Sequence, residues 1–182
     1  MSITIPLRKR IIRYTGVYDM HGLYNVMIEW LKARRYWVME SAYKHKPGSE
    51  FGRENEISID AEQKMTEYVQ SEIRIYFHLW DIQRVEVIER GRKKVLTKAR
   101  MEIWFSGTLI LDYNNHWEHS KFKKMLHDLY FRYVTGGPDG WMGSLYGDTL
   151  YYRIGKLHNL VKDFLNMEAR GNEYKHYLGD EM

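Results

Sequence analysis

Residues 73–80 (IRIYFHLW) and 99–112 (ARMEIWFSGTLILD) carry the clearest structural pattern of this chain. In both stretches apolar residues occupy the odd positions, while polar, charged and aromatic residues occupy the even ones, with Ile110 as the exception. Side chains of a β-strand point alternately to the two faces of its sheet, so this pattern is typical of half-buried antiparallel strands. The sequence therefore predicts a long central hairpin made of 71–89 and 95–113.

The alternation also predicts how the two strands pair. A polar turn is expected over 90–94, and pairing positions whose numbers add up to about 184 keeps odd residues opposite odd ones. This register places Trp80 opposite Trp104. A bulge near Asp81 would change the pairing beyond that point.

Shorter elements are expected around the hairpin. Strands are predicted at 9–17, 36–44 and 54–60. The segment 61–69 is either a bent continuation of the third of these strands or a helical turn, and the strand is the favoured interpretation. A helix is expected after Asp19, because aspartate is a favoured N-cap residue and an apolar stripe follows it.

Helical periodicity returns in the last third of the chain. Apolar residues recur every three or four positions over 122–133 and again from Leu150, which predicts two more helices. The segment 136–147 is rich in glycine and is expected to be the loop between them. Asp148 is then the predicted N-cap of the last helix, which is expected to stop at Gly171.

Length and composition narrow the class of protein. The 182 residues fit a single domain, 1–182, and the order of elements predicts an α+β fold. We expect a curved antiparallel sheet of four to six strands with three helices packed mainly on one face. The chain has no cysteine and no apolar run near the roughly 20 residues of a membrane span, so a cytoplasmic protein is the expectation.

Motifs for catalysis and for cofactor binding are weak. His116, His119 and His127 lack the spacing of a zinc-binding helix, and 136–147 has neither the ending nor the preceding strand of a phosphate-binding loop. Glu40 lies within an aromatic strand, where burial would penalise its charged form, but an exposed or paired carboxylate is the expected state. We expect no metal, no cofactor and no identifiable catalytic residue, which makes an enzyme the less favoured class.

The candidate site is the outer face of the predicted hairpin, formed by its even positions. Its proposed binding residues are Arg74, Tyr76, His78, Trp80, Arg100 and Trp104. Tryptophan, tyrosine and arginine supply most hot spots of protein interfaces, and a patch of rings is unfavourable in water. The structural alternative is that residues 1–46 or the last helix cover these side chains as a second layer of core.

The preferred function is a non-enzymatic binding or assembly domain whose partner is another protein or a second copy of the chain. A second hypothesis is a small apolar ligand, or a reaction, in a cavity, since the order of elements resembles helix-grip topologies. A third is single-stranded nucleic acid or a ribonucleoprotein, because aromatic residues on sheets stack bases. The net charge of only +4 is low for a dedicated nucleic-acid binder.

Overall fold

The computed structural model describes residues 2–49, 52–89, 92–115, 117, 120–137 and 140–167. The strands are β1 (Ile3–Pro6), β2 (Arg10–Tyr18), β3 (Trp37–Ser49), β4 (Gly52–Lys64), β5 (Val69–Glu89) and β6 (Arg92–Leu111). The helical elements are α1 (Met20–Ala33), α2 (Lys121–Leu129), the π-helical turn η1 (Tyr130–Val134) and α3 (Trp141–Phe164).

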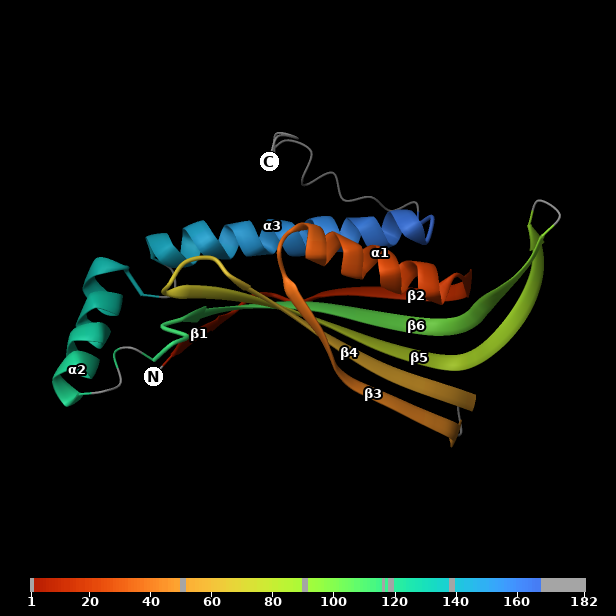
Figure 1. Ribbon diagram of the computed structural model, residues 1–182, viewed down its shortest axis with the longest axis horizontal. Coiled ribbons are helices and arrows are strands. Elements are labelled where there is room, and N and C mark those ends of the chain that lie inside the picture. Colours follow the sequence, from red (N-terminus) through yellow and green to blue (C-terminus); the bar gives the residue numbers. More distant parts are fainter. Residues whose placement is uncertain are drawn as a thin grey trace.

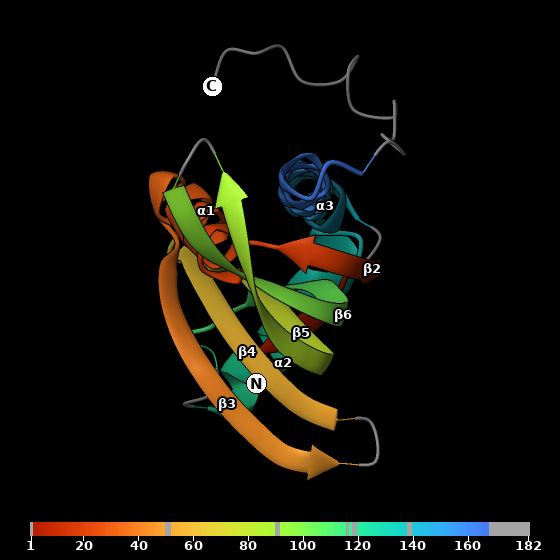
Figure 2. The same ribbon diagram turned by 90° about the vertical axis from the view of Figure 1, so that its right-hand side faces the viewer.

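The strands form one open antiparallel sheet in the order β1–β6–β5–β4–β3. Strand β2 also pairs with β6, beyond the end of β1, so both follow the same edge of β6. Figures 1 and 2 show α1 and α3 on one face of the sheet, while α2 stands beyond one end. The predicted α+β fold, with an antiparallel sheet and three helices, is confirmed.

The central hairpin is present, but its pairing register differs from the prediction. Trp80 lies opposite Arg100 and Tyr76 lies opposite Trp104, so each partner is four residues from the expected one. Two features cause the difference. Strand β6 already begins at Arg92, inside the predicted 90–94 turn, so that Glu89 pairs with Arg92, and a shift between Trp80 and Gln83 moves the pairing by one more residue. Odd residues still face odd residues up to Trp80, so every side chain of the site keeps its predicted face.

A bulge near Asp81, which the sequence analysis leaves open, is present. The pairing shifts between Trp80 and Gln83, and Asp81 adopts a positive φ of 55°. Bulges bend and twist a strand. Beyond this point the hairpin curves toward the side of the sheet that carries α1 and α3, as Figure 1 shows.

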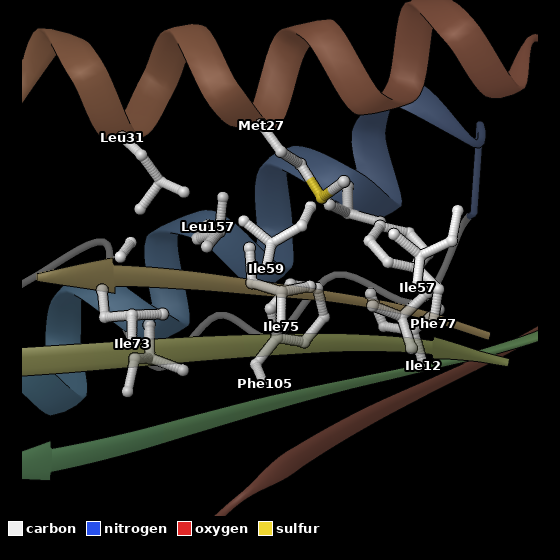
Figure 3. Packing of buried hydrophobic residues seen from close by; sticks show 14 of the residues in the cluster. Ile12, Met27, Leu31, Ile57, Ile59, Ile73, Ile75, Phe77, Phe105 and Leu157 are labelled. Carbon is white, nitrogen blue, oxygen red and sulfur yellow. The ribbon is translucent and has the colours of Figure 1, made fainter. Parts of the chain in front are cut away.

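The core lies between the sheet and these two helices. Odd positions of the hairpin face it, and Ile73, Ile75 and Phe105 are fully buried. Met27 and Leu31 of α1 and Leu157 of α3 meet them from the other layer (Figure 3). Side chains with no accessible surface leave no room for solvent, so the two layers are closely packed at these residues.

The predicted start of the last helix is wrong. Helix α3 begins at Trp141, after an N-cap at Gly140, so Asp148 is an internal helical residue and much of the expected 136–147 loop is helix. Gly147 is buried next to Leu109, which shows that this turn of the helix lies against the sheet. Burial of that kind offsets the low helix propensity of glycine, about 1 kcal/mol per residue.

The end of α3 and the β4–β5 connection also differ from expectation. Helix α3 ends at Phe164, and Gly171 lies outside the described residues. The strand expected through 61–69 stops at Lys64, and β5 begins at Val69. The Thr66 hydroxyl accepts hydrogen bonds from the amides of Tyr68 and Val69, which stabilises the turn.

Within the described residues, none of the helices has the length and apolar character that crossing a bilayer demands.

Candidate functional site

All six predicted site residues lie on the face of the sheet that points away from α1 and α3, which we call the outer face. Strand β5 contributes Arg74, Tyr76, His78 and Trp80, and β6 contributes Arg100 and Trp104. Figure 1 shows that α1 and α3 both lie on the opposite side of the sheet. Among the described residues, therefore, no helix covers these side chains as a second layer of core.

The rings of the outer face form one continuous group, which we call the aromatic cluster: Tyr76, His78, Trp80 and Trp104. Ring centroids are 5.3 Å apart for Tyr76 and Trp104, and 3.9 Å apart for His78 and Trp80. Tyr76 and His78 are 6.2 Å apart, so they join the two pairs. The two tryptophans lie at the ends of the cluster and are half-buried by their neighbours.

A cation lies against each tryptophan. The guanidinium carbon of Arg100 is 5.8 Å from the centroid of Trp80, and Lys9 Nζ is 4.3 Å from that of Trp104. Such contacts contribute roughly 0.5–1 kcal/mol at exposed sites. Lys9 lies between β1 and β2, just before the strand that the sequence predicts from residue 9. The sequence does not indicate its contact with Trp104, because the two residues are far apart in the chain.

Glu102 joins the aromatic cluster to the neighbouring strand β2. It accepts a hydrogen bond from the indole Nε1 of Trp104 and another from Arg13 Nε at 2.9 Å. The Trp104 hydrogen bond, supported by Arg13, lowers the pKa of Glu102 below its ordinary value. The carboxylate therefore remains charged at neutral pH and holds the Trp104 ring in place.

The arginines of the outer face are paired with carboxylates. Arg74 Nε is 2.6 Å from Asp60 Oδ1, and its Nη2 is 3.1 Å from Glu72 Oε1. Arg100 Nε is 3.1 Å from Asp81 Oδ2. The outer face is therefore balanced in charge, unlike the uncompensated positive surface that tracks a phosphate backbone.

A second charged group borders the cluster on the β3–β4 side. His78 Nε2 is 3.7 Å from Glu54 Oε2, and Lys46 Nζ is 2.7 Å from Glu56 Oε1. The Lys46 hydrogen bond lowers the pKa of Glu56, and a hydrogen bond from Tyr76 adds to the effect. Charged side chains thus surround the rings, an arrangement that resembles the polar rim and apolar centre of a protein interface.

A recess of about 480 Å³ opens beside Trp80, where β2 pairs with β6. Its lining residues are Arg13, Tyr14, Thr15, Trp80, Arg100, Met101 and Glu102. The volume falls within the usual range of ligand pockets, and it suits a side chain that a partner inserts next to the cluster. The sequence misses the β2 residues because their pairing with β6 spans almost ninety positions, as Arg13 and Glu102 show.

Two other residues that the sequence analysis considers for a chemical role, Glu40 and His127, have structural roles. Glu40 is exposed and accepts a hydrogen bond from the Tyr24 hydroxyl at 3.0 Å, which confirms the expected exposed or paired state. His127 is buried, bonds to the Tyr68 hydroxyl at 2.7 Å and stacks with Trp117.

Metal binding has no support in the part of the chain that the structure describes. It contains no group of three or more histidine and carboxylate side chains that could hold an ion. His116, Glu118 and His119 lie outside the described residues.

No protein-family model matches this chain, and no curated protein matches it either. Its function therefore has to be argued from the site. The outer face of the hairpin is the place where rings, cations and a recess come together.

Proposed function

We propose that this chain is a non-enzymatic binding domain that contacts a protein partner through the outer face of its β5–β6 hairpin. One observation carries the proposal: the aromatic cluster lies on the face that α1 and α3 leave uncovered. Preformed tryptophan and tyrosine side chains with nearby arginines are the residues that supply most of the binding energy in protein interfaces.

The charge of the outer face favours a protein over a nucleic acid. A phosphate backbone would have to compete with Asp60 and Glu72 for Arg74, and with Asp81 for Arg100. A protein surface can instead add its own charges of both signs to such pairs. The partner is a different protein or a second copy of this chain, which presents the same balanced surface.

The packing also favours the outer face over an internal ligand cavity. Ile59, Ile73, Ile75 and Phe105 face α1 and α3 from the sheet with no accessible surface. A ligand cavity of several hundred Å³ at these residues would leave part of their surface accessible. The helix-grip-like alternative therefore receives less support than the binding surface.

The test compares two variants with the wild type. Trp80→Ala combined with Trp104→Ala removes both ends of the aromatic cluster. Trp37→Ala removes a tryptophan that is 64% exposed on β3, outside the cluster, and serves as the matched control. Each protein is measured by light scattering against the 22.0 kDa chain mass and is used as bait in quantitative affinity capture from its source cells.

The wild type and Trp37→Ala are expected to form a dimer or to retain one specific protein. The double variant should bind at least tenfold more weakly, since each hot-spot residue contributes about 2 kcal/mol or more. A monomer that captures no protein would contradict the proposal. Equal binding by the double variant would contradict it as well, because the contact would then lie elsewhere.

A further inference from the structure

Helix α2 presents its apolar side to solvent. Its outward residues follow helical spacing, and the exposed ones are Phe122 (66%), Met125 (58%), Leu126 (43%), Leu129 (51%) and, in η1, Tyr133 (75%). We call these five residues the α2 stripe. In most surface helices such a stripe faces the core.

The side of α2 that contacts the domain is different. His127 is 2% exposed and bonds to Tyr68, and Phe131 packs against the hydrophobic core. His127 and Phe131 are four residues apart, so they share one side of the helix. A polar residue takes the buried position while the apolar stripe faces outward, so the domain itself does not explain the stripe.

The exposed apolar surface continues from η1 into the start of α3. Trp141, 53% exposed, donates a hydrogen bond from its indole to the carbonyl oxygen of Val134, and Leu145 follows one turn later at 57%. With roughly 200 Å² for each aromatic side chain, the rings of Phe122, Tyr133 and Trp141 together expose about 400 Å². The aliphatic residues extend this beyond the apolar patch of an ordinary monomer, roughly 300–600 Å².

The charges beside the stripe are mainly positive. Lys121 and Lys123 are the neighbours of Phe122, and at about 100° per residue they lie on its two sides. Arg132 lies next to Tyr133, and all three cations are exposed. Over 120–137 there are four basic side chains and a single acidic one, Asp128.

This charge pattern argues against a second copy as the occupant of the stripe. Two-fold symmetry would bring the cations of both copies to one interface, where Asp128 is the one acidic residue of the segment available to pair with them. An anionic lipid surface fits both the apolar stripe and the cations beside it. Apolar and aromatic side chains enter the headgroup boundary, while flanking lysines and arginines reach the phosphates.

We propose that α2, η1 and the first turns of α3 dock this domain on an anionic membrane surface, with the α2 stripe inserted between the headgroups. Helix α2 stands beyond the end of the sheet, so it can meet a flat surface without obstruction from α1 or from the body of α3 (Figure 1). The proposal concerns a different surface from the outer face and does not depend on it.

Vesicle flotation tests this proposal with two lipid compositions. One vesicle is pure phosphatidylcholine, and the other has about one third of it replaced by phosphatidylglycerol. Wild-type protein is expected to float with the anionic vesicles, to bind neutral ones much less, and to be released by high salt. Phe122→Gln with Leu129→Gln should weaken partitioning at least tenfold, and Lys121→Gln or Lys123→Gln about fivefold each.

The matched control is Ile88→Gln with Val95→Gln, which removes two residues that are 73% and 60% exposed at the hairpin tip. This control should bind vesicles like the wild type, and all variants should unfold at the wild-type denaturant midpoint. The proposal is overturned by absence of binding, by equal binding to neutral vesicles, or by an equal loss in the control. A doubled solution mass that the stripe variant abolishes would also overturn it, in favour of a second copy.

Discussion

Single buried polar groups give the sharpest tests at the residue scale, and Tyr18 is the first. It is 5% exposed, and its hydroxyl has no hydrogen-bond partner among the described residues. Burial raises the pKa of this phenol well above its ordinary value. Because an unpaired buried hydroxyl is unfavourable, we expect Tyr18→Phe to increase the free energy of unfolding in urea by about 1 kcal/mol. A decrease of that size would mean that the hydroxyl is bonded in solution.

His158 should make stability depend on pH. It is 8% exposed beside Phe105, and burial lowers the pKa of its imidazole below 6.5. The unfolded chain therefore binds this proton more tightly than the folded one, and stability decreases as pH falls below about 6.5. Urea unfolding between pH 7.5 and 5.5 should show a smaller decrease for His158→Gln than for the wild type.

An exposed histidine provides the control for this measurement. His21→Gln should keep the wild-type dependence, since His21 lies at the surface of α1. If His158→Gln and His21→Gln lose stability equally with acid, the buried imidazole does not cause the decrease.

At the scale of elements, the cap of α1 connects the helix to the hairpin. Asp19 Oδ1 accepts from the Gly22 amide at 2.9 Å, and Asp19 Oδ2 is 3.0 Å from Lys94 Nζ. The Gly22 hydrogen bond, supported by Lys94, lowers the pKa of Asp19. We expect Asp19→Ala to lower the free energy of unfolding by about 1 kcal/mol.

The cap and the ion pair can be separated with a second substitution. Asparagine caps helices as well as aspartate does, so Asp19→Asn should lose only the exposed ion pair, less than half of the alanine effect. Equal losses for both variants in the same denaturation assay would mean that Lys94, not the cap, is responsible.

The sequence predicts the elements whose pattern involves residues close together in the chain. The alternation of the hairpin and the cap of α1 depend on neighbouring positions, and both are confirmed. The start of α3 lies in a glycine-rich stretch, and there Gly147 is buried next to Leu109 of the sheet, a distant neighbour in the sequence that no local pattern encodes. The same holds for the register, because the pairing at the hairpin tip and the bulge between Trp80 and Gln83 together change every partner, while the side chains up to Trp80 keep their faces.

The six site residues follow the same logic. Their common face is predicted because all six occupy even positions of two strands, and even positions share one face of a sheet. The structure places them on that face. The ring contacts require the register, and the carboxylates that pair with the arginines come partly from β4 and from the bulge. Lys9 and Arg13 contribute through strand pairing that is distant in the sequence.

At the scale of the whole molecule, the sheet separates two populations of side chains. Apolar residues pack beneath α1 and α3, which lie on one side of the sheet (Figure 2). Rings and paired charges lie on the outer face. Each proposal concerns a surface that packing within the domain does not cover. The first is the outer face of the hairpin, and the second is the apolar side of α2 at the end of the sheet. The two surfaces lie on different elements, so one protein can use both.

The most direct test of this two-sided sheet compares adjacent residues of β6. Phe105 is fully buried and faces the helices, whereas Trp104 is part of the aromatic cluster. Measured by urea unfolding, Phe105→Ala should cost about 3–5 kcal/mol, as a core truncation does, and Trp104→Ala about 1 kcal/mol. Equal losses of several kcal/mol would contradict the account, because Trp104 would then belong to a second core and not to a binding surface.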